Sequence, residues 1–244
     1  MQERYLGDVH DYIKFALLRH LREKLKVRIG VNWYLTGPEN NNDGGQRGFL
    51  KKSAWKSLDE TLLEKLRPFE VQEYRTFENF ERDRILPEDT LYFETKVSTI
   101  VGRPTWHNQA ISKLSQAQLI FLDQDNGFEI KSMTGRTHKY AKFSEAVDYF
   151  ERGKIVVAIQ FVMKRNPQAR GDEIRNVLKQ RTGCSLNLPI VLGHVAPNIL
   201  FITICPGERV AEMSNTLNLF AMRSPFFKKD KRNMKDINRI EIIP

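Results

Sequence analysis

Cysteine is scarce in this 244-residue sequence, which contains only Cys184 and Cys205, without the paired spacing of a zinc site. We therefore expect a reduced, cytoplasmic protein with neither a structural disulfide nor bound zinc. No apolar run approaches the roughly 18 residues of a transmembrane helix, so no membrane association is expected. The G-x-G-x-x-G fingerprint of dinucleotide-binding folds and the P-loop are also absent. These absences direct attention to charge and to the pattern of apolar segments.

The sequence carries an excess of positive charge, with 39 Lys and Arg residues against 30 Asp and Glu residues and a net charge of +9. A basic surface attracts polyanions, of which nucleic acid is the commonest in a cytoplasm. The charge therefore favours a DNA or RNA partner. The alternative is a protein that is basic for no functional reason.

Residues 119–122 form the most apolar stretch that ends in a polar turn. Four consecutive apolar residues predict a strand buried on both faces, as in the middle of a parallel sheet. The strand runs directly into Asp123, Asp125, Asn126 and Gly127, and Gly127 allows a sharp turn. Because buried carboxylates are costly, we expect both aspartates to face solvent at the carboxyl end of the strand, where α/β sheets bind ligands.

The alternation of strand and helix patterns predicts a Rossmann-like α/β fold, with a mostly parallel sheet, helices on both faces and an N-terminal helix. No repeat or linker is visible, so we expect a single domain over residues 1–244, with 38–90 as a candidate inserted lobe. Helices are predicted over residues 5–26, 56–67, 106–114, 143–152, 172–180 and 209–219. Strands are predicted over 27–35, 69–77, 90–96, 118–122, 154–160, 197–204 and 238–243.

Residues 7–18, Gly-Asp-Val-His-Asp-Tyr-Ile-Lys-Phe-Ala-Leu-Leu, resemble a segment of bacterial large-subunit ribosomal RNA adenine-N6 methyltransferases. The family segment has the form Gly-Asn-x-x-Asp-x-x-Lys-His-x-x-Leu. Gly7, Asp11, Lys14 and Leu18 match at the same spacing, whereas Asp8 replaces the asparagine and a phenylalanine replaces the histidine. The resemblance implies a methyltransferase-like fold and an S-adenosylmethionine pocket that these N-terminal residues, Asp8 included, help to form.

In that family the central strand ends in Asp-Pro-Pro-Tyr, of which only Asp123 carries over. The two prolines and the aromatic residue are absent. The segment from Asn32 to Gly37 stands where an Asp-x-x-x-Gly turn usually embraces the cofactor, which makes Asn32 a further candidate cofactor contact. The chain also resembles an uncharacterised bacterial group with a Leu-Asp-x-Asp-Asn-Gly motif at this site, which implies no particular function.

The first hypothesis is S-adenosylmethionine-dependent methyl transfer to a nucleic-acid base. Asp123 would accept a hydrogen bond from the target amine, with Asn126 as its helper and Asp125 as the third candidate catalytic residue. A base in a duplex would have to be flipped out, and Tyr140 and Trp33 are candidates for stacking on it. The candidate substrate-binding residues are Lys139, Gln160, Lys164 and Arg165; Gln160 has the alternative role of capping a strand end.

Two alternatives remain open at this level. Asp123, Asp125 and Glu129 supply the hard oxygen ligands of a magnesium- or manganese-dependent nuclease, whereas the first hypothesis requires no metal. The missing prolines and cofactor turn are also what a non-catalytic nucleic-acid-binding module on a degenerate methyltransferase scaffold would show.

Overall fold

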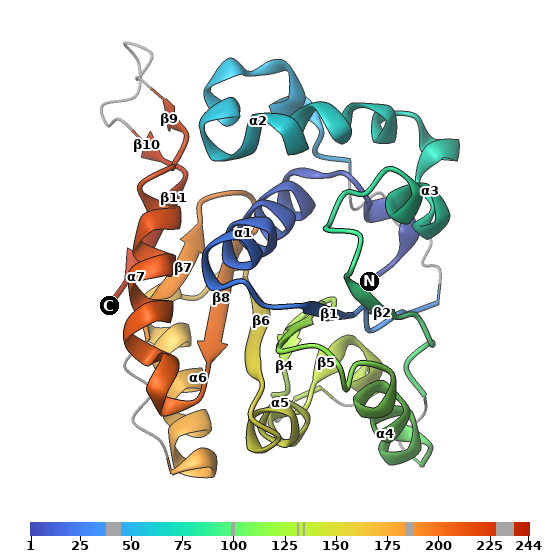
Figure 1. Ribbon diagram of the computed structural model, residues 1–244, viewed down its shortest axis with the longest axis vertical. Helices are drawn as coiled ribbons and strands as arrows, with labels where there is room; N and C mark the ends of the chain where they lie inside the picture. The colour runs from blue at the N-terminus through green and yellow to red at the C-terminus, as the bar shows by residue number, and fades with distance from the viewer. Residues whose placement is uncertain (38–44, 99–100, 131, 134, 184–187, 228–236) are drawn as a thin grey trace.

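A computed structural model describes residues 1–37, 45–98, 101–130, 132–133, 135–183, 188–227 and 237–244. Its centre is a seven-stranded sheet in the order β11-β7-β8-β6-β3-β1-β2 (Figure 1). The strands of this sheet are β1 (Ile29–Asn32), β2 (Leu91–Phe93), β3 (Leu119–Leu122), β6 (Ile155–Val162), β7 (Ile190–Gly193), β8 (Asn198–Ile204) and β11 (Ile240–Ile243). Two small ribbons pair β4 (Gly127–Phe128) with β5 (Tyr140–Ala141), and β9 (Phe226–Phe227) with β10 (Ile237–Asn238).

The sheet is mixed but mostly parallel, as predicted. β2, β1, β3 and β6 pair in parallel, whereas β8 is antiparallel to both β6 and β7, and β11 is antiparallel to β7. β3 lies between β1 and β6, and all four of its residues are buried. The apolar run over residues 119–122 is therefore a central strand, as its composition predicts.

Helices cover both faces of the sheet, in agreement with the predicted α/β layering. The α-helices are α1 (Val9–Leu25), α2 (Lys56–Lys65), α3 (Phe77–Arg82), α4 (Arg103–Lys113), α5 (Phe143–Glu151), α6 (Pro167–Thr182) and α7 (Val210–Ala221). Alternate strand residues divide between two cores: Phe121 and Val157 pack with α1 and α7, whereas Leu122 and Ala158 pack with α4, α5 and α6. This division follows from the two-residue period of a strand, which sends neighbouring side chains to opposite faces.

The N-terminal helix α1 is buried along most of its length, lying between β1 and α2 in Figure 1. It begins at a helix cap, because the Asp8 carboxylate accepts hydrogen bonds from the backbone N–H groups of His10 and Asp11 at 2.8 and 2.9 Å. This cap orients the first turn of α1, which carries the residues of the resemblance segment.

The chain between β1 and β2 forms a helical lobe that includes α2 and α3, within the range 38–90; residues 38–44 lie outside the described residues. The strand predicted over residues 69–77 is wrong. The 3₁₀ helices Arg67–Glu70 and Gln72–Tyr74 lie there, followed by the start of α3. Pro68 favours a helical first turn, and Phe69 is fully buried while Val71 is exposed, so the apolar alternation does not mark a sheet face. The lobe packs into the same hydrophobic core as α1.

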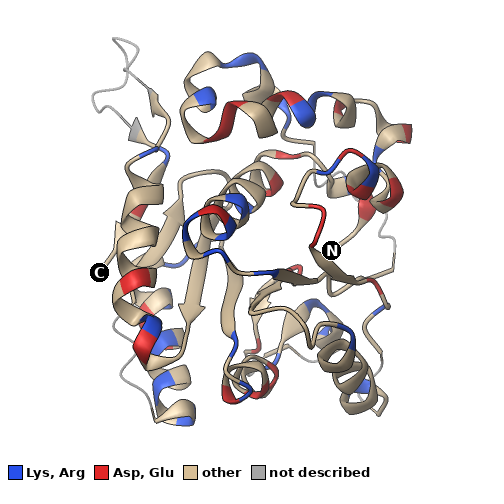
Figure 2. Ribbon diagram, viewed as in Figure 1, with Lys and Arg blue, Asp and Glu red and all other residues tan. Residues whose placement is uncertain are grey.

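The strands in the middle of the sheet carry almost no charged residues, whereas the helices around them carry many (Figure 2). Cys205 is buried with a free thiol, and Cys184 lies outside the described residues. Within the described ranges, no helix combines the length and the apolar character needed to cross a membrane.

Candidate functional site

A cavity of about 690 Å³ opens between the start of α1 and the carboxyl ends of β3 and β6. Its volume lies within the range of small-molecule sites, roughly 300–1,000 Å³. The sequence-predicted site residues that line it are Asp8, Asp11, Lys14, Asp123, Asp125, Asn126, Lys139, Gln160, Lys164 and Arg165. Segments that are more than 100 residues apart in the chain therefore meet at one place.

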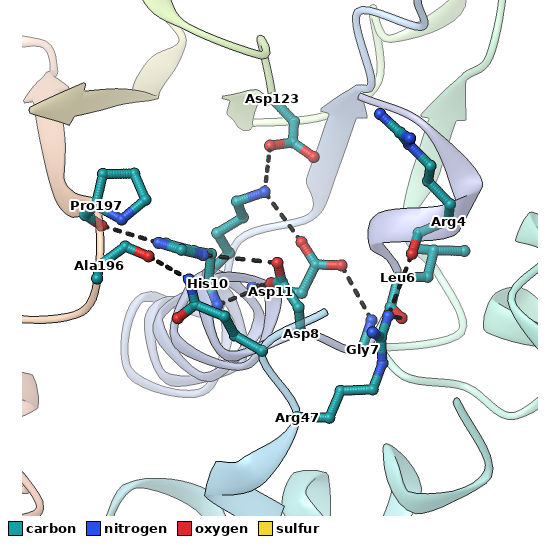
Figure 3. Close-up of polar contacts among 12 residues, drawn as sticks. Arg4, Leu6, Gly7, Asp8, His10, Asp11, Arg47, Asp123, Ala196 and Pro197 are labelled. Atoms are coloured by element: carbon teal, nitrogen blue, oxygen red, sulfur yellow. Dashed lines mark hydrogen bonds and ion pairs between the residues drawn. The ribbon is translucent and has the colours of Figure 1, made fainter. Parts of the chain in front are cut away.

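Lys14 joins the N-terminal helix to the central strand. Its Nζ lies 3.0 Å from Asp11 Oδ1 and 2.9 Å from Asp123 Oδ1, and all three side chains are at least 95% buried (Figure 3). The second oxygen of Asp123, Oδ2, is buried and has no hydrogen-bond partner among the described residues. One end of Asp123 is therefore held in place while the other remains available as an acceptor.

The expectation that the two aspartates face solvent is wrong. Asp123 is 1% exposed, and the Asp125 side chain is only 8% exposed. Burial is tolerated because each carboxylate has its own cation: Lys14 for Asp123, and the ammonium group of Met1 for Asp125. Thr36 Oγ1 also donates to Asp125 Oδ2 at 2.9 Å, and the Met1 ammonium donates to the Tyr34 carbonyl oxygen at 2.9 Å.

His10 lines the cavity next to Pro197. Its Nε2 donates to the Pro197 carbonyl oxygen at 2.9 Å, and its Nδ1 lies 3.6 Å from Asp8 Oδ2 (Figure 3). The ring packs edge-on against Phe161 at a centroid distance of 5.2 Å. His10 thus connects the cap of α1 to the loop before β8.

The charges in this cluster are set by burial and by each other. Burial raises the pKa of Asp11 to about 7; the Lys14 ammonium opposes this shift, and the Asp8 and Asp123 carboxylates add to it. Burial alone would lower the pKa of Lys14, but Asp123 and Asp11 raise it well above its usual value. Burial alone would raise the pKa of Asp8, but His10 and Lys14 outweigh burial, so the pKa of Asp8 is lowered. Asp11 is therefore a carboxyl that titrates near neutral pH.

Gln160, predicted as a substrate contact, holds the turn that follows β3. Its Nε2 donates to the carbonyl oxygens of Asn126 and Phe161 at 3.1 and 2.8 Å, and its Oε1 accepts from the Phe128 N–H at 3.1 Å. The Arg170 guanidinium also donates to Oε1 at 3.1 Å. The amide of Gln160 is thus engaged with the backbone that carries Asp125 and Asn126.

Gly127 is required at the centre of this turn, so Gly127→Ala is expected to destabilise the fold by about 1–3 kcal/mol. Its φ is +122°, and an added Cβ would lie 2.3 Å from Gln160 Oε1. Chemical denaturation measures the effect. Gly207→Ala is the matched control, because a Cβ there meets nothing within 4 Å. Equal stability of the two variants would contradict the importance of this contact.

Three predicted site residues do not line the cavity. Gly7 lies beside it, where its N–H donates to Asp11 Oδ2 at 3.2 Å and Phe69 packs against its α-carbon. Asn32 is fully buried at the end of β1, where its Oδ1 lies 3.4 Å from the backbone nitrogen of Tyr34. Glu129 Oε1 accepts from the Phe143 N–H at 3.0 Å, at the start of α5.

Of the two aromatic candidates for base stacking, one lines the cavity and the other does not. Trp33 is fully buried in an aromatic cluster with Phe15, Phe80 and Tyr92, so it does not stack on a base in the cavity. Tyr140 lines the cavity and is half-buried. The space around Trp33, next to the end of β1, is thus filled by aromatic residues from α1, α3 and β2.

The carboxylates are not arranged as a metal site. Within the part of the chain that the structure describes, no group of three His, Cys, Asp or Glu side chains is placed to hold a metal ion. Asp123, Asp125 and Glu129 instead face Lys14, the Met1 ammonium and the start of α5, respectively. The nuclease hypothesis therefore receives no geometric support from the described residues.

Several cavity residues were not predicted as site residues. Met1, Gln124, Arg136, Phe161 and Met163 line the cavity together with the predicted set. Gln124 Nε2 donates to the Ile159 carbonyl oxygen at 2.7 Å, while its Oε1 is buried without a partner among the described residues. Gln124 lies between the two predicted site aspartates, and Met163 directly precedes the predicted site residue Lys164. Their positions in the sequence could therefore have indicated Gln124 and Met163 as site residues.

A scan against protein-family models finds no matching family, and a search of the curated proteins finds no significant match. Any functional assignment must therefore be argued from the cavity itself.

Proposed function

We propose that the protein is an S-adenosylmethionine-dependent methyltransferase that modifies an amino group of a nucleic-acid base. The proposal depends on how the two carboxylate oxygens of Asp123 are bonded. Lys14 holds one carboxylate oxygen at 2.9 Å, and the other is buried at the cavity without a hydrogen-bond donor among the described residues. A buried acceptor without a donor is costly, and an exocyclic amine supplies the N–H that it lacks.

The residues of the cavity fit the cofactor. S-adenosylmethionine, when bound, supplies an electrophilic methyl group on a sulfonium. Among the described residues that line the cavity, Asp8, Asp11 and Asp123 lie around Lys14, which forms ion pairs with Asp11 and Asp123. This local group of three carboxylates favours a cationic ligand group beside Lys14, although basic side chains outnumber acidic ones over the lining as a whole. We propose that Asp8 and Asp11, at the start of α1, hold its cationic end, as the resemblance of residues 7–18 implies.

The chain's own contribution to the reaction is positioning. Asp123 would accept a hydrogen bond from the amine and direct the nitrogen lone pair toward the methyl group. Lys14 fixes the orientation of that carboxylate through its contact with Oδ1. The site is buried, so the hydrogen bond acts in a low-dielectric surrounding where it has a larger effect than in water.

The nucleic-acid side of the proposal rests on the basic residues of the cavity. Lys164 and Arg165 are exposed after the end of β6, and Arg136 is exposed on the loop before β5. Side chains of this kind hold phosphates and so orient the substrate without reading its sequence. The net charge of +9 adds long-range attraction.

Two measurements test the proposal directly. Calorimetry should show binding of S-adenosylmethionine, and incubation with radiolabelled cofactor should transfer methyl groups to RNA or DNA. Glu60→Gln provides a control, because Glu60 is exposed on α2, pairs with Lys56 and does not line the cavity. Absence of cofactor binding at millimolar concentration would overturn the proposal.

The pKa of Asp11 predicts that cofactor binding strengthens as the pH rises from 5.5 to 7.5. A bound cation lowers the pKa of Asp11 from its free-state value of about 7, so the attraction is present above pH 7 and is lost as the pH falls below it. Calorimetry across this range measures the trend. Asp11→Asn should remove most of the pH dependence, and a variant with an unchanged profile would show that Asp11 is not the titrating group.

A further inference from the structure

The acceptor oxygen of Asp123 lies too deep in the cavity for a base within a duplex to reach it. Asp123 lines the cavity but is only 1% exposed, and its Oδ2 is buried without a hydrogen-bond partner among the described residues. A stacked and paired base presents only its edges, so enzymes that act on a base take it out of the helix or use a single strand. The group that reaches Asp123 must therefore enter the cavity as an unpaired nucleotide.

The cavity mouth carries apolar side chains that a flat ring can contact. Met163, directly after β6, lines the cavity and is 80% exposed. Phe161 and Tyr140 also line it and are half-buried. A flexible thioether and aromatic rings pack favourably on the face of a base.

Basic side chains flank these apolar residues. Lys164 and Arg165 follow Met163 in the chain and are exposed, and Arg165 pairs with Glu173 on α6 at 2.7 Å. Arg136 lies near Tyr140 in the chain and is also exposed. The carboxylates Asp11 and Asp123, in contrast, are buried in the interior of the cavity. Positive charge outside and apolar contacts at the entrance are the combination by which proteins bind single strands.

We infer that the cavity mouth is a binding site for an unpaired nucleotide of single-stranded nucleic acid. Met163 and Tyr140 contact the base, Lys164, Arg165 and Arg136 contact the phosphates, and duplex of the same sequence is disfavoured. This inference rests on the proposed function in taking Asp123 as the group that the base must reach. It adds the strandedness of the substrate and two residues that select for it.

Fluorescence anisotropy with labelled RNA and DNA oligonucleotides of roughly 12 nucleotides tests the inference, because single-strand sites span about 4–16 nucleotides. Each oligonucleotide is measured alone and annealed to its complement. We expect the single strand to bind more tightly, and Met163→Ala or Tyr140→Ala to weaken its binding about fivefold or more. Lys164→Ala should reduce the salt dependence, whereas Met163→Ala should leave it unchanged.

Met222→Ala is the matched control. Met222 is 82% exposed, directly follows α7 and does not line the cavity, so its replacement should leave binding unchanged. Equal or tighter binding of duplex, or equal effects of Met163→Ala and Met222→Ala, would overturn the inference.

The failure of this inference is distinguishable from failure of the proposed function. Methyl transfer to intact duplex would overturn the single-strand site while supporting the methyltransferase. Single-strand binding that depends on Met163, in a protein that does not bind S-adenosylmethionine, would support the site and overturn the methyltransferase.

Discussion

Replacement of Asp123 by asparagine is expected to lower methyl transfer by about 100-fold or more while the fold is retained. An amide keeps one oxygen, and that oxygen can still accept the hydrogen bond from Lys14 at the Oδ1 position. The position of Oδ2 then becomes an NH₂ group, which donates rather than accepts. A donor facing the target amine cannot hold it in line with the methyl group, and the negative charge is lost as well.

The rate of transfer from radiolabelled S-adenosylmethionine measures this effect, and thermal unfolding checks that the variant is folded. Asp172→Asn is the matched control, because Asp172 is half exposed on α6 and lies 3.7 Å from Arg175. Near-normal transfer by Asp123→Asn would show that Asp123 is not the acceptor. Loss of transfer in both variants would point to a nonspecific effect.

The location of the site was predictable because it depends on local patterns. Four apolar residues followed directly by Asp123 indicated a central strand with a polar carboxyl end, and β3 is that strand. The helical pattern over residues 5–26 indicated α1. Parallel neighbours bring their carboxyl ends to one edge, so Lys164 and Arg165 after β6 could be placed near Asp123. These predictions needed only periodicity and strand direction.

The burial of the site was not predictable, because it depends on partners distant in sequence. The cost of burying a carboxylate argued for solvent exposure, yet Lys14 lies 109 positions before Asp123 and neutralises it. The Met1 ammonium does the same for Asp125. Nothing local to residues 123–126 indicates either cation, so the expected exposure was wrong although the expected position was right.

The order and direction of the last strands also exceed what local patterns can indicate. β8 lies between β6 and β7 and runs antiparallel to both, and β7 was not predicted as a strand. Its apolar run, Ile190 to Leu192, has only three residues before Gly193, which is shorter than the run of about four to eight residues that indicates a buried strand. In the lobe, the apolar spacing of Phe69 and Val71 matched a strand, but Pro68 begins a helical turn there.

Replacement of Lys14 by methionine is expected to lower the free energy of unfolding by about 3–5 kcal/mol, because it leaves two buried carboxylates without their cation. In a domain of this size the loss corresponds to a decrease in Tm of roughly 6–20 °C. Lys14 is 4% exposed and contacts Asp11 and Asp123 at 3.0 and 2.9 Å. Methionine preserves much of the side-chain length, so the effect reports the charge more than the packing.

Lys24→Met on the same helix provides the control for this prediction, because Lys24 is 45% exposed and pairs with the exposed Glu23. Its effect should stay within about 0.5 kcal/mol. The destabilisation by Lys14→Met should also be smaller at pH 5.5 than at pH 7.5. Asp11 has a folded-state pKa raised above its usual 3.8, so the stability gained from its protonation is lost as the pH rises through that pKa. Equal Tm values for the two variants would mean that Lys14 is dispensable, and that Asp123 must be held by other contacts.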